Sequence, residues 1–190
     1  MNQHNQRFSV VGTTGSGKTT VAREIAACLQ IPHIELDALF WEEDWTGVPE
    51  ETFRERISSA IAAETWVSDG NYSRVRDLVW ARADTVVFLD YPFCRVFLQL
   101  LSRTFRRGLK KEVLWADNRE TMRKAFFSRD SILLYMLRTY WRNRKKYPAL
   151  FSQTEYTHLK VVHLQTPRET EDWLSGLSKA ENGTYLSGSK

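Results

Sequence analysis

A glycine-rich stretch near the N-terminus combines residue types that bind phosphate. Residues 12–19 read GTTGSGKT and match the pattern G-x-x-x-x-G-K-[ST] at every fixed position. Glycines let backbone N–H groups wrap an anion, and a following helix adds its positive N-terminal end. We therefore expect Lys18 to reach the β- and γ-phosphates of ATP and the Thr19 hydroxyl to ligate Mg²⁺. The residues assigned to nucleotide binding are Gly12, Thr13, Thr14, Gly15, Ser16, Gly17, Lys18, Thr19 and Thr20.

The loop lies where this motif requires it, between a strand and a helix. Residues 7–12 predict a short buried strand, and apolar residues at helical spacing predict a helix over 18–30. Further strands are predicted over 33–36, 66–72, 83–92 and 158–164, and further helices over 49–63, 93–107, about 120–146 and 166–177. This alternation predicts an α/β fold, a parallel sheet with helices on both faces. We expect one domain over 1–180 and a loose tail over 181–190.

Three predicted strands end in an aspartate, at the edge of the sheet where ligands bind in open α/β folds. Asp90 ends the longest apolar strand and is assigned to the Mg²⁺ site, with a turn or a helix cap as the alternative. Asp37 could orient an acceptor hydroxyl or take its proton, or it could simply cap a helix. Asp69 is interpreted as a turn residue, and Gly70 and Asn71 are candidates for close contact with a substrate.

Positive charge is concentrated in one part of the chain. Residues 95–146 hold 15 Lys and Arg against 4 Asp and Glu, a net of +11, whereas the rest holds 12 against 19, a net of −7. Such a segment favours nucleotide phosphates, nucleic acid or a membrane surface, or it forms solvated helix faces. Arg103, Arg106 and Arg107 share one predicted helix face. We interpret the region of about 103–122 as an arginine-bearing lid that excludes water from the phosphates.

The remaining composition argues against several classes of protein. No stretch approaches the roughly 18 apolar residues of a membrane span, and the polar N-terminus lacks the apolar core of a signal peptide. The four histidines and two cysteines show no metal-ligand spacing. Cys28 and Cys94 are expected to be buried thiols. These features favour a cytoplasmic protein.

Several segments together resemble the adenylate-kinase-like P-loop family labelled "DNA topology modulation protein". They read GTTGSGKTT, IELDALFW, DGNYSRVRDLVWARADTVVFLDYP, RTFRRG, DNRE and FFSRDSIL, and the likeness spans roughly residues 7–165. The wider relatives are nucleoside monophosphate, shikimate and gluconate kinases. The resemblance implies a five-stranded parallel sheet, an arginine-rich helical lid, and an acceptor region between the second helix and the DGN turn.

The resemblance also implies roles for individual positions. Asp37 lies where shikimate-kinase-like enzymes use an aspartate on the acceptor. Arg119 would be a lid arginine, with Arg129 and Arg138 as phosphate-facing partners on the substrate. The loop after the last strand would contact adenine through Thr166, Pro167 and Arg168.

These residues are compatible with more than one function. The favoured hypothesis is an ATP-dependent phosphotransferase that moves the γ-phosphate of Mg-ATP to a small-molecule or nucleotide acceptor. Its catalytic residues would be Lys18, Asp37, Arg107 and Arg119, with Arg103 on the nucleotide. The alternatives are a P-loop NTPase that acts as a nucleic-acid-associated regulator, although no DNA-reading motif is present, and a nucleotide-binding protein without turnover. The acceptor is not identified; an aromatic pocket or an ordinary core would account for Trp41, Trp45, Trp66 and Tyr72. We expect a monomer.

Overall fold

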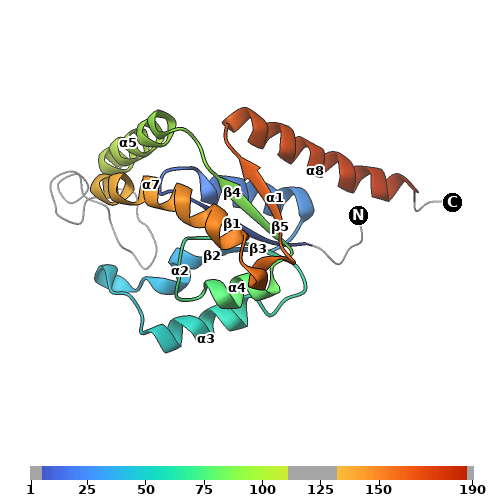
Figure 1. The fold of residues 1–190 in the computed structure, drawn as a ribbon, viewed down its shortest axis with the longest axis horizontal. Coiled ribbons are helices and arrows are strands. Elements are labelled where there is room, and N and C mark those ends of the chain that lie inside the picture. Colours follow the sequence, from blue (N-terminus) through green and yellow to red (C-terminus); the bar gives the residue numbers. More distant parts are fainter. Residues whose placement is uncertain (1–5, 111–131, 188–190) are drawn as a thin grey trace.

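Five parallel strands form the centre of the molecule. The computed structural model describes residues 6–110 and 132–187, with side chains described for 6–106 and 132–179. The strands are β1 (Arg7–Gly12), β2 (His33–Glu35), β3 (Trp66–Asp69), β4 (Thr85–Leu89) and β5 (Lys160–Leu164). They pair in the order β2-β3-β1-β4-β5, and every pairing is parallel (Figure 1). The five-stranded parallel sheet is thereby confirmed, with β1 and its phosphate loop at the centre.

Alternating side chains along the strands build a hydrophobic core on each face of the sheet. Val10 and Val87 belong to one core cluster, and their neighbours Val11 and Val86 belong to the other. The first cluster is covered by α1 (Lys18–Leu29), α5 (Phe93–Lys110) and α8 (Pro167–Ser187), and the second by α3 (Glu50–Ala60) and α4 (Arg76–Arg82). Helix α7 (Ile132–Phe151) contributes residues to both clusters. A fully buried aliphatic or Phe side chain contributes about 1.5–3 kcal/mol relative to exposure.

The structure adds short elements and moves several boundaries. Helices α2 (Leu36–Phe40) and α4 and the 3₁₀ turns η1 (Glu43–Trp45) and η3 (Thr154–Tyr156) are too short for periodicity to predict them. Strand β3 ends at Asp69 because Gly70 turns the chain with φ 149°. Helix α8 continues to Ser187, whereas residues 181–187 were expected to belong to a loose tail. Cys94 is exposed and Cys28 is only partly buried, whereas both were expected to be buried thiols.

The lid predicted over 103–122 is described only in part. Residues 103–110 continue α5, and residues 111–131 lie outside the described part of the chain. Helices α5 and α7, which flank these residues, lie side by side at one end of the molecule (Figure 1). Helix α5 directly follows β4, so this end carries the carboxyl edge of the sheet. Of the helices described, none is both long and apolar enough to span a membrane.

Candidate functional site

The phosphate loop joins β1 to α1 in a conformation that depends on glycine. Gly12, Gly15 and Gly17 have φ values of 151°, 89° and 91°. A Cβ atom on Gly12 would lie 2.6 Å from the carbonyl oxygen of Leu89, and one on Gly15 would lie 2.9 Å from Leu100 Cβ. Helix α1 begins after Gly17 with no capping side chain and no acidic residue in its first turn. The N-cap residue therefore supplies no side-chain acceptor to the first N–H groups of the helix, which suit an anion.

Lys18 lies among charged groups from three other elements. Its Nζ donates a 3.3 Å hydrogen bond to the carbonyl oxygen of Thr13, across the loop. Burial lowers the pKa of Lys18, and the positive charge of Arg103 lowers it further, while Asp69 and Asp37 act in the opposite direction. The structure thus brings Arg103 of α5 and two carboxylates into the electrostatic neighbourhood of the loop lysine. A bound phosphate would compensate the lysine charge more strongly than either carboxylate does at a distance.

The carboxylate in contact with Thr19 is Asp69. The Thr19 hydroxyl donates a 2.6 Å hydrogen bond to Asp69 Oδ2, and His33 Nε2 donates to Asp69 Oδ1 at 2.9 Å. Ser16, inside the loop, has a buried hydroxyl with no hydrogen-bond partner among the described residues. Hydroxyl and carboxylate oxygens such as those of Thr19 and Asp69 are suitable ligands for Mg²⁺. The N–H groups of the uncapped helix and the Ser16 hydroxyl can bind phosphate oxygens. Thr19, Asp69 and Lys18 are therefore the residues that could hold a magnesium–nucleotide complex.

Asp90 occupies a different environment from the one expected for a magnesium residue. Its Oδ1 accepts a 2.8 Å bond from Arg144 Nε, and its Oδ2 lies 3.1 Å from His163 Nε2. No hydrogen bond joins Asp90 to Thr19 in the part of the chain that the structure describes. Asp90 is buried and paired with residues of α7 and β5, and its assignment to the Mg²⁺ site stays a prediction. Strands β3 and β4 both flank β1, so Asp69 and Asp90 differ mainly in the direction of their side chains.

Asp37 lies on α2 beside a group of aromatic rings. The Tyr72 hydroxyl donates a 2.5 Å hydrogen bond to Asp37 Oδ1. Burial and the nearby charge of Asp37 raise the pKa of Tyr72, so the phenol remains a donor. The ring of Phe40 contacts those of Trp41 and Tyr72, with centroids 4.7 and 5.0 Å apart. Trp66, in contrast, is fully buried in the core and is not part of this group.

Four consecutive residues connect the phosphate loop to the Asp37 region. Asp69 accepts from Thr19, Asn71 is bonded to Gly12, and Tyr72 donates to Asp37. Gly70 lies between them, where a Cβ would be 2.9 Å from Leu36 Cβ. Sequence reasoning treated Asp69 as a turn residue and missed this role. The signal was the direct succession of Asp, Gly, Asn and Tyr at the end of a strand.

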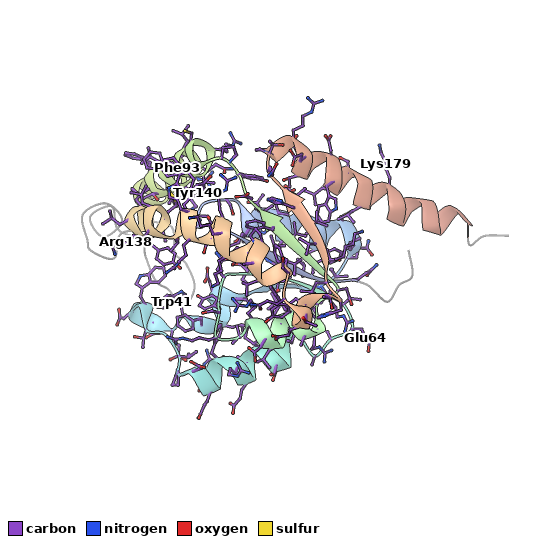
Figure 2. The ribbon with its side chains drawn as sticks, viewed as in Figure 1. Trp41, Glu64, Phe93, Arg138, Tyr140 and Lys179 are labelled. Atoms are coloured by element: carbon purple, nitrogen blue, oxygen red, sulfur yellow. The ribbon has the colours of Figure 1, made fainter. Side chains whose placement is uncertain are left out.

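The remaining expected site residues belong to α7, to the start of α8, or to residues that the structure does not describe. Arg138 of α7 is exposed and projects toward the end of the molecule that also carries Trp41 (Figure 2). Thr166 caps α8 by accepting from Glu169 N at 3.2 Å, Pro167 is the first residue of that helix, and Arg168 is exposed. Contact of these three residues with adenine stays a prediction. Arg119, Arg129 and the side chain of Arg107 lie outside the described residues.

Comparisons with known proteins agree with this architecture. A family model described as "ATPase family associated with various cellular activities (AAA)" matches residues 8–90, which span β1 to the end of β4. A gluconokinase from Sinorhizobium meliloti 1021 is 18% identical, with 98% of this chain and 99% of that chain covered and a TM-score of 0.52. A shikimate kinase from Bacteroides thetaiotaomicron is 17% identical, with 93% and 98% covered and a TM-score of 0.52. A search of curated proteins found no significant match. The chain therefore has the P-loop fold that these two kinases share.

Proposed function

We propose that this protein is an ATP-dependent phosphotransferase that moves the γ-phosphate of Mg-ATP to a hydroxyl group of a small acceptor. The observation that carries the proposal is the position of Asp37. It lies close enough to Lys18 for its charge to act on the lysine, although it belongs to α2 and not to the phosphate loop. Nucleotide binding alone needs no such carboxylate. A carboxylate whose charge acts on the phosphate lysine could orient an acceptor hydroxyl and remove its proton.

The residues of the chain divide the work as follows. The loop N–H groups and Lys18 hold the phosphates and balance their charge. Thr19 and Asp69 hold the magnesium ion, which draws negative charge from the phosphates when it is bound. Asp37 orients the acceptor hydroxyl with one carboxylate oxygen, while Tyr72 fixes the other. Arg103 adds positive charge beside the loop lysine.

The fold of the two kinases described above supports this proposal, because both are named for phosphorylating a small acceptor. The acceptor of this chain is a separate question, which the enzyme itself can answer. ADP release from Mg-ATP should be measured against nucleoside monophosphates, nucleosides, sugar acids, polyols and short DNA, with a control lacking acceptor. We expect release that depends on one class of small acceptor. Release that rises only with DNA would favour the nucleic-acid-associated regulator and contradict the proposal.

Two variants separate the parts of the site. Lys18→Ala should remove transfer, because it takes away the cation that is expected to reach the β- and γ-phosphates. Asp37→Asn should lower transfer by about 10²–10⁴-fold, the usual contribution of general acid–base catalysis, with little change in the Kd for Mg-ATP. Equal losses of ATP binding and transfer in Asp37→Asn would give that residue a structural role instead.

A further inference from the structure

The side-chain amide of Asn71 is bonded to both backbone groups of the first glycine of the phosphate loop. Gly12 N–H donates to Asn71 Oδ1 at 3.3 Å, and Asn71 Nδ2 donates to the carbonyl oxygen of Gly12. The backbone pairing of β1 with β3 ends at Val10 and Asp69. Gly12 lies two residues beyond that point. The Asn71 amide therefore makes the hydrogen bonds to Gly12 that the backbone of β3 no longer provides.

Gly12 has little freedom to move without disturbing the loop. The space at its Cα is filled by the carbonyl oxygen of Leu89 at 2.6 Å and by Ser16 Oγ at 2.9 Å from where a Cβ would stand. Its carbonyl and N–H groups fix the direction in which the chain leaves β1 toward Thr13. A change at Gly12 would therefore displace the residues that face the phosphates.

Tyr147 of α7 is bonded to the same side-chain amide of Asn71. Its hydroxyl donates a 2.9 Å hydrogen bond to Asn71 Oδ1. The ring is buried and packs against Phe88 and Trp80, with centroid distances of 5.1 and 6.3 Å. Burial raises the pKa of Tyr147, so the hydroxyl stays protonated. Two donors therefore converge on Oδ1, which leaves Nδ2 facing the Gly12 carbonyl.

We propose that Asn71 is a positioning residue of the phosphate loop and that Tyr147 fixes its amide in the orientation that the loop requires. The effect on nucleotide affinity rests on the proposed function, whereas the effect on the loop itself does not. The last residue of β3 and the turn after it would then hold the loop at both ends, at Gly12 through Asn71 and at Thr19 through Asp69. Helix α7, which is not part of the phosphate-binding motif, would thereby help to fix the backbone of Gly12 at the start of the loop.

The test compares three variants with one matched control. Asn71→Ala removes both bonds to Gly12, and Asn71→Asp places a carboxylate oxygen against the Gly12 carbonyl at nearly unchanged volume. Tyr147→Phe removes only the hydroxyl. The control is Tyr140→Phe, since Tyr140 is also buried on α7. Its hydroxyl donates at 3.0 Å to the carbonyl oxygen of Tyr91 and accepts from Arg144 at 3.2 Å, and among the described residues it has no bond to Asn71 or Gly12.

Hydrogen–deuterium exchange in the nucleotide-free protein is the first measurement. We expect peptides covering residues 10–18 to exchange faster by about threefold or more in both Asn71 variants and in Tyr147→Phe, but not in Tyr140→Phe. Titration of Mg-ATP should show Kd raised about tenfold or more in the Asn71 variants, because each loses at least one hydrogen bond to Gly12. Smaller increases are expected in Tyr147→Phe.

The outcomes decide separately on the two proposals. Parental loop exchange in Asn71→Asp would overturn the role of Asn71, and equal exchange in Tyr147→Phe and Tyr140→Phe would overturn that of Tyr147. Parental protein that binds no Mg-ATP would contradict the proposed function, and the exchange measurement would still decide on Asn71.

Discussion

The hydroxyl of Thr19 lies 2.6 Å from Asp69 Oδ2, so the first turn of α1 and the carboxyl end of β3 share a hydrogen bond. A serine or threonine after the loop lysine holds magnesium in P-loop proteins, and the groups that orient such a ligand matter nearly as much as the ligand. The Thr19–Asp69 pair therefore marks the side of the sheet on which the metal would lie.

Asp69→Asn and Asp90→Asn should affect different properties of the protein. We expect Asp69→Asn to lower Mg²⁺-dependent phosphate transfer by about 10–100-fold, because the amide no longer offers a charged oxygen beside Thr19. Asp90→Asn should instead reduce the free energy of unfolding by about 1–3 kcal/mol while transfer is retained, because it weakens the bonds from Arg144 and His163. Steady-state kinetics and urea unfolding of both variants provide the check. A transfer defect confined to Asp90→Asn would return the metal role to that residue.

Tyr72→Phe should affect the acceptor and leave the nucleotide alone. Without the Tyr72 hydroxyl, Asp37 loses the bond that fixes Oδ1, so the carboxylate rotates more freely. We expect kcat/KM for the acceptor to fall about tenfold, the effect of one charge-assisted hydrogen bond, with the Kd for Mg-ATP unchanged. Tyr156→Phe is the control, since Tyr156 packs on Trp80 in the core. A rise in the Kd for Mg-ATP in Tyr72→Phe would contradict the assignment.

Two glycine-to-alanine substitutions should change stability in opposite directions. Gly70 has φ 149°, and a Cβ there would lie 2.9 Å from Leu36 Cβ, so Gly70→Ala should cost about 1–3 kcal/mol. Gly176 lies inside α8 with open space around its Cα, so Gly176→Ala should add about 0.5–1 kcal/mol. Denaturant unfolding of both proteins measures the difference. Stabilisation by Gly70→Ala would show that the turn tolerates a side chain.

The N-terminus of α8 should make stability depend on pH through Glu169. Gln165 N–H donates to Glu169 Oε2 at 2.8 Å, and this bond holds the pKa of Glu169 below its ordinary value of 4.5. A pKa that is lower in the folded state stabilises the fold above the unfolded pKa, and this stabilisation is lost as the pH falls through the folded value.

The corresponding measurement is Tm against pH for the parental protein and Glu169→Gln. We expect the parental protein to be more stable at pH 7 and the difference to shrink below about pH 4.5. Glu171→Gln changes an exposed carboxylate on the same helix and should show a smaller difference. A Glu169→Gln difference that is constant between pH 7 and pH 3 would rule out this contribution.

The phosphate loop could be predicted from the sequence because all its parts are contiguous. Gly12, Gly15 and Gly17 act through the backbone and Lys18 and Thr19 through their side chains, but all five lie in one short stretch, so no distant residue is needed to recognise them. The parallel sheet could be predicted for a similar reason. Apolar strands alternate with amphipathic helices along the chain, and such units bury their apolar faces only as a parallel sheet covered on both sides.

Only the tertiary structure decided which aspartate faces Thr19. Asp69 ends β3 and Asp90 directly follows β4, the two strands beside β1, and the sequence carries no record of which way each side chain turns. Asn71 is bonded to Gly12, 59 positions before it, and to Tyr147, 76 positions after it. Contacts across such separations depend on strand order and on the packing of α7, which are properties of the whole core and not of any local stretch.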